Sequence, residues 1–573
     1  MQQFQNVIPR HHRVLRVQRV IRNVRLNFLR NWSWFEDYSG PAGRIWLAWC
    51  LISVLYGDYE LIPRRELWGG LRTLAVGISD EPWLVLGDFN AVLDDSEVRG
   101  RAADTMREQG ALWKRLDRML VNEAWLEKWP GSSYISALPS TSDHSPLIIS
   151  GTNGEAERPI FRFDNYLAQL PGFLSSVDNI WKHHITGTEM YGVVCKLKAL
   201  KTVFRRQRKQ KGNLTENVKL AKAYLDKAQE LFAVYRDDIL LHLVKCCRMV
   251  YSEAIKLEMS MLKQRAKLRW MKHGDQNSRV FFRKINSKRA KHMIFQITNA
   301  TGEVLTDKHA ITEEFVSYFQ TLLGGCSTRI IDLSFLRTEL KHTLTLEEAS
   351  FLIRPVTREE IKEAIFDIDE ESAPGPDGYT SAFFRTAWPV VGQAISEAIC
   401  EFFRTGQLLK QVNTTLLALI PKVNLPSYVS DYRPISCCNV LYKAITKVIV
   451  KRMQPILHLL IDFSQTAFVP GRSIADNILL AQTPGWFVGW IEQCVTTASF
   501  SVSLNGAIYG FFKGSRGLRQ GDPVSPYLFV LVMETWNSLL KYRVQNAADF
   551  QYHWKCKEMG ILNLCFADDV LLF

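Results

Sequence analysis

The sequence predicts a multidomain protein with α/β and α+β parts joined by a helical segment. Its 573 residues exceed what one hydrophobic core usually holds. Strand-like apolar runs are frequent in residues 44–150, whereas residues 161–323 carry apolar side chains at three- and four-residue steps, the spacing of amphipathic helices. Beyond residue 345, strand and helix patterns alternate around glycine-rich turns. We therefore expect four segments, residues 1–30, 31–155, 156–344 and 345–573.

Composition narrows the class of protein. Hydrophobic residues make up 47% of the chain and aromatic residues 11%, which excludes a disordered protein. The net charge of +13 favours a polyanionic partner, most simply a nucleic acid. The 11 cysteines show no CxxC spacing, which indicates free thiols in a reducing compartment. No apolar run is as long as a membrane span, so we expect a soluble protein without a membrane partner.

The first 30 residues are rich in arginine and contain no acid. Arginine recurs at every third position from Arg10 to Arg25, and the first acid is Glu36. Organellar transit peptides share this bias, but a three-residue spacing drifts around a helix, and serine is missing. We therefore favour a basic arm, or a piece of a damaged reading frame, over a targeting signal.

The first third of the chain contains three polar motifs beside apolar strands. Residues 82–95 (PWLVLGDFNAVLDD) predict a buried strand that runs into Asp88 and Asn90, which share one face and can reach a metal or a phosphate. Residues 115–118 (RLDR) contribute Asp117. Residues 141–150 (TSDHSPLIIS) place Asp143 beside His144, a candidate general base with its orienting carboxylate. The alternative for each motif alone is an ordinary turn or cap.

Together these motifs resemble the endonuclease/exonuclease/phosphatase family, and specifically the endonuclease of plant non-LTR (LINE-type) retrotransposons. The resemblance covers roughly residues 30–150 and implies a two-sheet α/β sandwich. It places Asp88 and Asn90 in the metal and phosphate centre, with Asp117 in support. It also implies that Asp143 and His144 act as the base and that Tyr56 faces the phosphate.

The first third also departs from the family in two ways. The family's metal-binding glutamate lies on an early strand, and no acid before Asp88 stands in that context; Glu36 belongs to a different element. Only about twenty polar residues separate GDFN from RLDR, where the family has strands. We therefore expect a partial sandwich that binds Mg2+ or Mn2+ poorly and does not cleave DNA.

Residues 156–344 predict a helical, basic connector. The run FRRQRKQKGN, from Phe204, is expected to separate two helices. Residues 266–292 mix basic side chains with Trp270, Phe281 and Phe282, a pattern that can hold a nucleic-acid backbone and stack bases. The alternative is a helix with a solvated basic face. The segment is similar to the connector of plant LINE polyproteins, which favours contact with template RNA or target DNA.

Four blocks stand in order in the last third. Residues 373–384 (APGPDGYTSAFF) form a turn that opens a helix, so its amides are candidates to face an anion. Residues 416–453 predict a strand, a turn, a second strand and a basic helix, with Lys422 and Arg433 flanking the turn as a candidate triphosphate clamp. Residues 465–482 predict a loop and a helix. In residues 514–534, glycines around Gln520 and Gly521 allow a backbone to approach a nucleotide closely.

The chain ends in LCFADDVLLF, residues 564–573, which predicts a tight hairpin with Asp568 and Asp569 at its tip. Two adjacent acids at a buried turn require neutralisation, usually by a divalent cation, although a surface turn is the alternative. The four blocks and this hairpin resemble the reverse transcriptase of non-LTR retrotransposons over residues 345–573. The resemblance implies fingers and palm of a right-hand polymerase, with Lys422, Arg433, Gln520 and Gly521 facing nucleotide and template.

By the same resemblance, Asp568 and Asp569 hold Mg2+ or Mn2+. The partners are an RNA template, a DNA target and deoxynucleoside triphosphates. The place of action is the nucleus or the cytoplasm.

One palm strand of that family has no counterpart here. It carries an aspartate that holds both metal ions, and it belongs between residues 482 and 514. The acids between Arg433 and Gln520 are Asp462, Asp476 and Glu492, and none follows a strand-like apolar run. Two-metal transfer needs carboxylates from two segments.

The family's thumb is also expected to be missing after Phe573. We therefore expect an incomplete reverse transcriptase without polymerase activity. The alternatives are a non-catalytic nucleic-acid-binding remnant, or a transcript that restores the strand at the Gln482–Thr483 junction.

Overall fold

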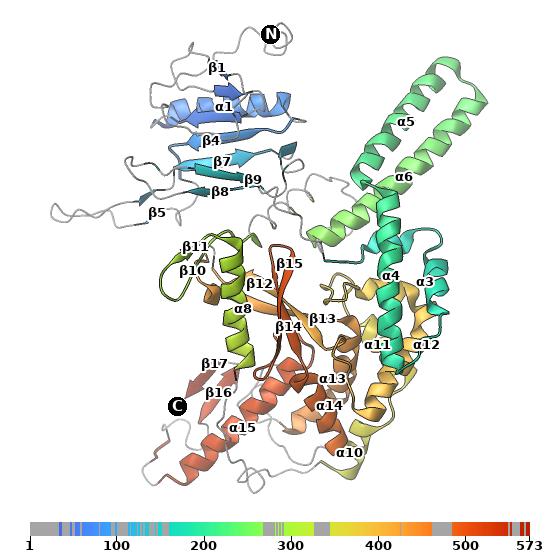
Figure 1. Cartoon of the computed structure of the whole chain (residues 1–573), viewed down its shortest axis with the longest axis vertical. Helices are drawn as coiled ribbons and strands as arrows, with labels where there is room; N and C mark the ends of the chain where they lie inside the picture. The colour runs from blue at the N-terminus through green and yellow to red at the C-terminus, as the bar shows by residue number, and fades with distance from the viewer. Residues whose placement is uncertain are drawn as a thin grey trace, which may run out of the picture. The chain divides into compact units, whose positions relative to one another are not determined.

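The structure is a computed structural model in which the chain forms two compact units, residues 1–156 and 157–573. It describes residues 160–267, 292–325, 344–460 except 424–425, and 484–547. It also describes separate stretches between residues 34 and 151, single residues between 281 and 288, and parts of 550–572. The proposed arm, residues 1–30, lies outside the described residues. Both units mix helices with several small sheets, so the predicted α/β and α+β composition is confirmed (Figure 1).

The first unit is built on a five-stranded sheet in the order β1-β2-β3-β4-β7. Its central strands β3 and β4 are parallel, and the helix α1 (Leu61–Gly77) connects them. β4 pairs antiparallel with β7, so that Asp88 stands opposite Asp117. The strands of this unit are β1 (Trp34–Glu36), β2 (Trp46–Ala48), β3 (Ile52–Tyr56), β4 (Leu84–Asp88), β5 (Val98–Arg99), β6 (Trp113–Lys114), β7 (Asp117–Val121), β8 (Ser132–Ser136) and β9 (Leu147–Gly151).

Apolar side chains cover both faces of this sheet. Leu67 and Leu71 of α1 pack against Leu55 and Val85 on one face. On the other face, Leu84 packs with Trp125 and with Ile149 of β9, which pairs with β8 in a separate two-stranded sheet. The polar piece between GDFN and RLDR contains only the two-residue ladder of β5 and β6 among its described residues. The first unit therefore buries its central strands on both sides, as parallel strands require.

The second unit contains the longest helices, and polar side chains mark where several of them begin. Thr188, Asn213, Asp237 and Asp307 accept hydrogen bonds from the first-turn amides of α4, α5, α6 and α8. The helices are η2 (Asn165–Gln169), α3 (Phe173–Trp181), α4 (Glu189–Lys211), α5 (Leu214–Tyr235), α6 (Asp238–Ala266), α8 (Lys308–Gly324), α10 (Leu346–Ile353), α11 (Arg358–Phe366), α12 (Ser381–Thr405), η3 (Val429–Asp431), α13 (Val440–Leu460), α14 (Gly485–Thr496) and α15 (Ser525–Gln545).

Two expectations about the basic connector are wrong. The basic residues of the run that begins at Phe204 do not lie between two helices: they form the last two turns of α4, which ends at Lys211, and only Gly212 and Asn213 separate α4 from α5. Phe281 is fully buried in the main hydrophobic core and is not available to stack on bases. Trp270 and Phe282 lie outside the described residues.

The main core joins the helices of the connector to those that follow residue 344. Phe163 lies between Phe204 of α4 and Phe383 of α12, with ring centroids 5.0 Å and 5.2 Å apart. The Tyr379 hydroxyl donates a hydrogen bond to the Leu197 carbonyl at 2.7 Å. Connector and polymerase-like helices therefore pack as parts of one unit.

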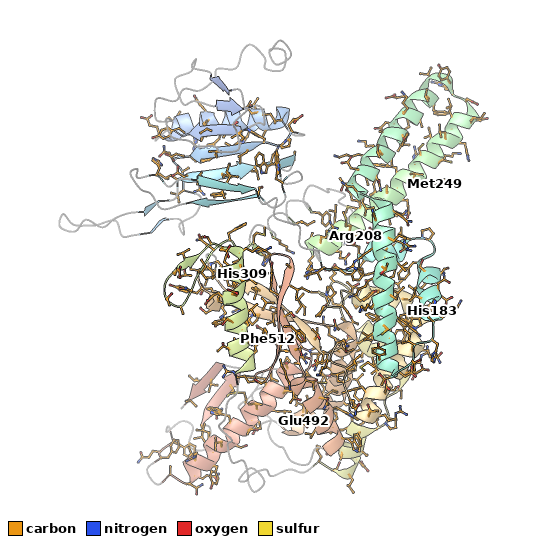
Figure 2. All side chains as sticks on the ribbon, viewed as in Figure 1. His183, Arg208, Met249, His309, Glu492 and Phe512 are labelled. Carbon is orange, nitrogen blue, oxygen red and sulfur yellow. The ribbon has the colours of Figure 1, made fainter. Side chains whose placement is uncertain are left out.

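A four-stranded sheet in the order β13-β12-β14-β15 forms the second core (Figure 1). β12 pairs antiparallel with β13 and parallel with β14, and α8 covers the sheet through Phe315 and Phe319. Phe512, labelled on β15 in Figure 2, packs against Phe500 of β14 at 5.8 Å between ring centroids. The strands of the second unit are β10 (Ile297–Thr298), β11 (Val304–Leu305), β12 (Thr414–Pro421), β13 (Tyr432–Cys438), β14 (Ser499–Leu504), β15 (Ala507–Lys513), β16 (Asn563–Phe566) and β17 (Asp569–Leu572).

The C-terminal hairpin is formed by β16 and β17, as the sequence predicts. Phe566 pairs with Asp569, and Asp568 lies outside the described residues. Among the described residues these strands pair only with each other, and Leu571 and Leu572 are exposed on β17. An apolar edge of this kind favours aggregation. No helix among the described residues is both long and apolar enough to cross a membrane.

Candidate functional site

The carboxyl end of β4 in the first unit forms a rigid polar turn. Asp88 ends the strand and is buried, with 5% of its surface exposed. The Asn90 amide N–H donates to Asp88 Oδ1 at 2.8 Å, and Asn90 Nδ2 donates to the Gly57 carbonyl at 2.6 Å. Asn90 adopts a left-handed conformation with φ of 45°, which asparagine tolerates better than most residues. The turn therefore fixes the positions of both predicted site residues.

Glycine at position 87 makes this turn possible. Its φ is 135°, and a Cβ atom there would lie 1.9 Å from the Leu55 carbonyl oxygen. A second close approach occurs at Gly57, where a Cβ atom would lie 2.6 Å from the Phe89 carbonyl oxygen. The ends of β3 and β4 thus come together only because side chains are missing at these two positions.

Two further side chains meet Asp88 from different elements. Asp117 begins β7 directly opposite Asp88, and His144 precedes β9. His144 Nδ1 lies 3.1 Å from Asp117 Oδ2, and His144 Nε2 lies 3.9 Å from Asp88 Oδ2. Ligand atoms of these three residues all lie within 4.8 Å of one another. Two carboxylates and an imidazole at this spacing fit a divalent cation, or a general base flanked by acids.

The structure assigns His144 a carboxylate partner that the sequence did not suggest. Adjacency in the chain predicted Asp143, which lies outside the described residues, whereas Asp117 contacts the ring 27 positions away in sequence. The register of β4 against β7 places Asp117 opposite Asp88, and β9, which follows His144, lies in contact with β7. Tyr56 ends β3 opposite Asp88 and is 39% exposed.

Glu36 stands apart from this cluster by backbone position. It ends β1, and the sheet order places β1 three strands from β4, roughly 14 Å at ordinary strand spacing. The three-residue cluster therefore lacks a third carboxylate among the described residues.

In the second unit, Lys422 and Arg433, the residues predicted to clamp a triphosphate, belong to the β12–β13 hairpin. Arg433 pairs with Ile420 on the neighbouring strand, and both are exposed. Lys422 follows β12; its Nζ donates to the Ser430 carbonyl at 2.7 Å, so the lysine lies along the turn. Because residues two apart in a strand share a face, Lys422 and Arg433 project from the same side of this hairpin.

The loop that carries Gln520 and Gly521 lies against β13. The Gln520 carbonyl accepts a hydrogen bond from the Ser436 amide at 2.8 Å, and the Gln520 side chain is exposed. Gly521 has φ of 102°, a conformation that favours glycine. The fold thus brings residues 433 and 520, far apart in sequence, to one strand.

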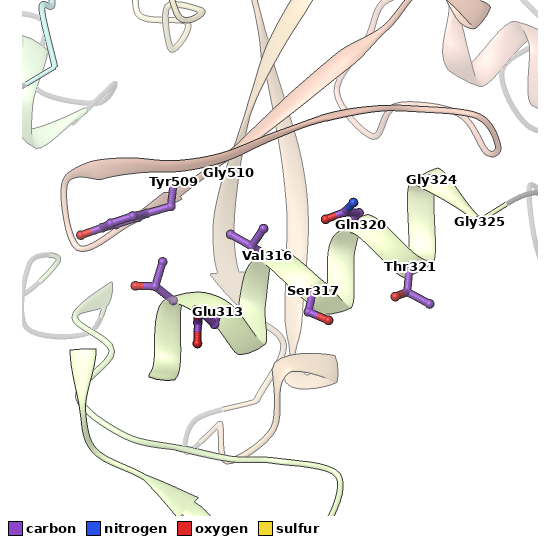
Figure 3. A pocket seen from close by; sticks show the side chains of 10 residues that line it. Glu313, Val316, Ser317, Gln320, Thr321, Gly324, Gly325, Tyr509 and Gly510 are labelled. Carbon is purple, nitrogen blue, oxygen red and sulfur yellow. The ribbon is translucent and has the colours of Figure 1, made fainter. Parts of the chain in front are cut away.

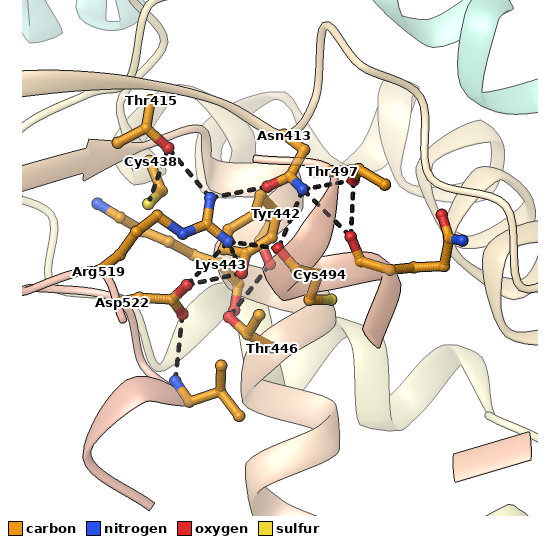
Figure 4. A network of polar contacts seen from close by, with 12 residues as sticks. Asn413, Thr415, Cys438, Tyr442, Lys443, Thr446, Cys494, Thr497, Arg519 and Asp522 are labelled. Carbon is orange, nitrogen blue, oxygen red and sulfur yellow. Dashed lines mark hydrogen bonds and ion pairs between the residues drawn. The ribbon is translucent and has the colours of Figure 1, made fainter. Parts of the chain in front are cut away.

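A buried polar network anchors this loop and was not predicted from the sequence (Figure 4). Arg519 donates to Asn413 Oδ1 at 2.7 Å, to Thr415 Oγ1 at 3.1 Å and to the Cys494 carbonyl at 2.8 Å. The Tyr442 hydroxyl accepts from Arg519 and donates to Asp522 Oδ2 at 2.6 Å. Burial and the charge of Asp522 raise the pKa of Cys494 to about 12. In the sequence, the spacing of Arg519 and Asp522, three residues apart, was the only feature that could have indicated this network.

The predicted anion site at residues 373–384 is wrong. The Asp377 amide donates to Asn439 Oδ1 at 3.1 Å, and the Tyr379 amide donates to Asp377 Oδ1 at 3.0 Å. Thr380 and Ser381, at the start of α12, are buried. The amides of this turn are already used within the fold. Burial raises the pKa of Asp377 to about 6, against opposing effects of its hydrogen bond from Tyr379 and of Lys201 and Lys443.

The C-terminal acids are described less fully. Asp569 begins β17, while Asp568 and both side chains' surroundings lie outside the described residues. Between Arg433 and Gln520, none of the described strands carries an acid; Glu492, labelled in Figure 2, lies on α14. Asp462 and Asp476 lie outside the described residues.

A shallow groove of about 780 Å3 runs between α8 and β15 (Figure 3). Val316, Gln320 and Tyr509 line it, and Glu313 is its carboxylate. The predicted site residues are not among those that line it, so the groove carries no part of either candidate centre.

Comparisons with known proteins match both parts of the chain. Residues 25–144 match the Endonuclease/Exonuclease/phosphatase family, and residues 420–573 match the family Reverse transcriptase (RNA-dependent DNA polymerase). The chain is 24% identical to the Xenopus laevis "Transposon TX1 uncharacterized 149 kDa protein" over 54% of this chain and 26% of that protein. It is 24% identical to a Nasonia vitripennis "Retrovirus-related Pol polyprotein from type-1 retrotransposable element R2", over 44% of this chain and 26% of that protein.

A shorter match is to the Arabidopsis thaliana "Uncharacterized mitochondrial protein AtMg01250", 41% identical over 12% of this chain and 54% of that protein. The chain spans about a quarter of the length of the transposon and polyprotein relatives. It therefore carries an endonuclease-type segment followed by a reverse transcriptase-type segment, with retrotransposon polyproteins among its relatives.

Proposed function

We propose that this chain, with its endonuclease-type and reverse transcriptase-type segments, is part of a plant LINE-type polyprotein whose ancestral reactions are target nicking and RNA-templated DNA synthesis. We propose further that it performs neither reaction and retains nucleic-acid binding. The observation that supports inactivity is that, among the described residues between Arg433 and Gln520, no strand bears a carboxylate. The match to an Arabidopsis protein supports the plant origin.

The first unit supports a partial nuclease centre. A Mg2+ or Mn2+ ion held by Asp88 and Asp117 would polarise a phosphate oxygen. His144, held by Asp117 at 3.1 Å, is placed to accept a proton from an attacking water, and Asn90 holds the Asp88 carboxylate in position. Glu36 ends a strand three places away in the sheet, so it does not supply the glutamate that the resemblance requires beside Asp88.

A primer-extension assay tests the polymerase part. The full chain, with an RNA template, a DNA primer and either Mg2+ or Mn2+, is expected to give no template-dependent extension. Extension that disappears in the Asp568→Ala variant would overturn the proposal of inactivity. A matching plasmid assay is expected to show no nicking by the parent chain above that of the His144→Ala variant.

Nucleic-acid binding is supported by a row of cations on α4. Lys198, Lys201 and Arg205 recur at three- and four-residue steps and share one face of the helix. Lys201 Nζ and the Arg205 guanidinium both lie over the Phe161 ring, at 5.5 Å and 5.6 Å from its centre. Fixed cations around an aromatic ring suit phosphates and a stacked base.

A salt series tests this binding face. The chain is expected to bind single-stranded RNA with an affinity that falls steeply as salt rises. The Lys198→Gln/Arg205→Gln variant should reduce the log–log slope by about 1.4, because each phosphate contact with a single strand contributes about 0.7. Lys222→Gln/Lys245→Gln, which removes two cations from α5 and α6, is the matched control. Equal slopes for all three proteins would overturn the assignment of binding to α4.

A further inference from the structure

The helices α5 and α6 form an antiparallel hairpin with an inner apolar seam (Figure 1). Leu225 and Ala228 of α5 pack against Val244 of α6, and Phe232, Cys247 and Tyr251 are partly buried beside them. A left-handed residue, Arg236, and the cap Asp237 form the tight turn between the helices. Met249, labelled in Figure 2, marks α6 in this hairpin.

Each helix carries a second apolar stripe beside the inner seam, and much of it faces solvent. Most residues of this second stripe stand one position before a residue of the inner seam. The others extend the stripe along each helix at steps of three or four residues. On α5 the stripe contains Leu220, Tyr224, Leu231 and Val234, and on α6 it contains Ile239, Leu243, Cys246 and Val250. Tyr224 is 69% exposed, Val234 72% and Ile239 77%.

Helix geometry places both stripes on the same side of the hairpin. One residue back along an α-helix is a rotation of about 100°. In the hairpin the second helix runs in the opposite direction to the first, and its inner seam also faces the opposite way. These two reversals cancel, so the rotation points to the same side of the hairpin on both helices. The result is one flat, two-helix apolar face, which we call the outer face.

The opposite side of the hairpin is polar. Residues one position after the inner seam are Asp226, Gln229 and Ala233 on α5, and Lys245, Arg248 and Ser252 on α6, so five of the six are polar or charged. The contrast between the two sides is typical of a helix pair that packs on another surface, since large exposed apolar patches mark interaction sites.

The charge of the hairpin favours a protein partner over a nucleic acid. Residues 213–250 contain six Lys and Arg against five Asp and Glu, whereas the whole chain carries a net charge of +13. On α5 one cation, Lys227, interrupts the outer stripe between Tyr224 and Leu231. A nearly neutral apolar face has little attraction for phosphates.

We propose that the outer face binds the outer face of a second copy of this chain, which produces a four-helix bundle with two-fold symmetry. A flat face made by two antiparallel helices is self-complementary in shape, as such a dimer requires. The 22 residues of α5 span about 33 Å, and two helices are about 20 Å wide. The dimer would therefore bury roughly 1,300 Å2 in total, at the lower end of specific interfaces.

Sedimentation velocity of the full chain over a concentration series tests the proposal. The parent is expected to shift from monomer to dimer and not beyond. The face variant Tyr224→Glu/Val250→Glu should remain monomeric. The matched control, Gln229→Glu/Ser252→Glu, adds the same charge to the polar side of the same helices and should dimerise like the parent. Circular dichroism verifies that both variants keep their helices.

Three outcomes would overturn the proposal. A parent that stays monomeric at all concentrations shows that no second copy covers the outer face. Equal loss of the dimer in face variant and control locates the interface elsewhere. Weaker RNA binding by the face variant alone, with a monomeric parent, identifies the outer face as a nucleic-acid surface.

Discussion

Arg519 and Asp522 form a buried ion pair, with Arg519 Nη2 3.1 Å from Asp522 Oδ2. Both side chains are less than 8% exposed. Tyr442 contacts both partners, and the Arg519 guanidinium also lies 4.1 Å from the centre of the Tyr442 ring. The pair thus joins the loop of Gln520 and Gly521 to β12 and α13, and it determines where that loop lies on β13.

The Arg519→Met variant is expected to lose about 3–5 kcal/mol of unfolding free energy, because it leaves the Asp522 carboxylate buried without its cation. Urea unfolding measures the change. Arg404→Met, an exposed arginine of the same unit, is the control and should change stability by less than about 0.5 kcal/mol. Similar losses in both variants would show that the ion pair is not what stabilises the loop.

Gly87→Ala is expected to unfold or strongly destabilise the first unit, by about 3 kcal/mol or more, because its Cβ atom would overlap the Leu55 carbonyl and its φ is positive. Gly69→Ala is the matched control. Gly69 lies within α1, and a Cβ atom there would meet nothing within 4 Å, so alanine should stabilise the helix by about 0.5–1 kcal/mol. Limited proteolysis and thermal melting of the two variants measure this, and a tolerated Gly87→Ala would contradict the close approach of β3 and β4.

Asp117→Asn is expected to weaken Mn2+ binding at the first unit by about tenfold or more, because it removes one of two carboxylates and the charged partner of His144. Calorimetric titration of Mn2+ into parent and variant measures the change. Asp178→Asn, which removes a carboxylate paired with Lys182 on α3, controls for nonspecific binding. Equal affinities in the three proteins would remove Asp117 from the metal centre.

Asp377→Asn is expected to raise the melting temperature of the second unit at pH 7.5 and to change it little at pH 4. Burial raises the folded pKa of Asp377 to about 6, above its ordinary value of 3.8, so the folded state favours the protonated form. The stability that this group contributes is present below pH 3.8 and is lost as pH rises to about 6. Asparagine keeps the oxygen that accepts from the Tyr379 amide and avoids the buried charge.

Thermal melts of parent and variant at the two pH values measure this difference. A variant that is less stable than the parent at pH 7.5 would show that Lys201 and Lys443 outweigh burial at this carboxyl.

The order of motifs was readable in the sequence because each depends on local patterning. The strand that ends at Asp88, the β12–β13 hairpin and the hairpin at the C-terminus all follow from apolar runs and turn residues. Phe281 and the turn at residues 373–384 were misjudged for one reason. The local sequence around an aromatic residue among basic residues, or around a glycine-rich turn before a helix, is the same whether the fold exposes or buries it. Local patterning therefore did not predict the burial of either feature.

By itself, the sequence determined which families the two segments resemble, since motif spacing is a property of the chain alone. That the polymerase-like part lacks one palm acid stays a prediction. The tertiary structure decided which side chains meet. Asp117 stands opposite Asp88 because β4 and β7 pair in one register, and His144 reaches both because β9 packs beside β7. Arg519 reaches Asn413 because β12, α13 and the loop pack together. The outer face of α5 and α6 exists only because the two helices are antiparallel. Contacts of this kind join residues far apart in sequence, so their partners are selected by packing and not by local propensity.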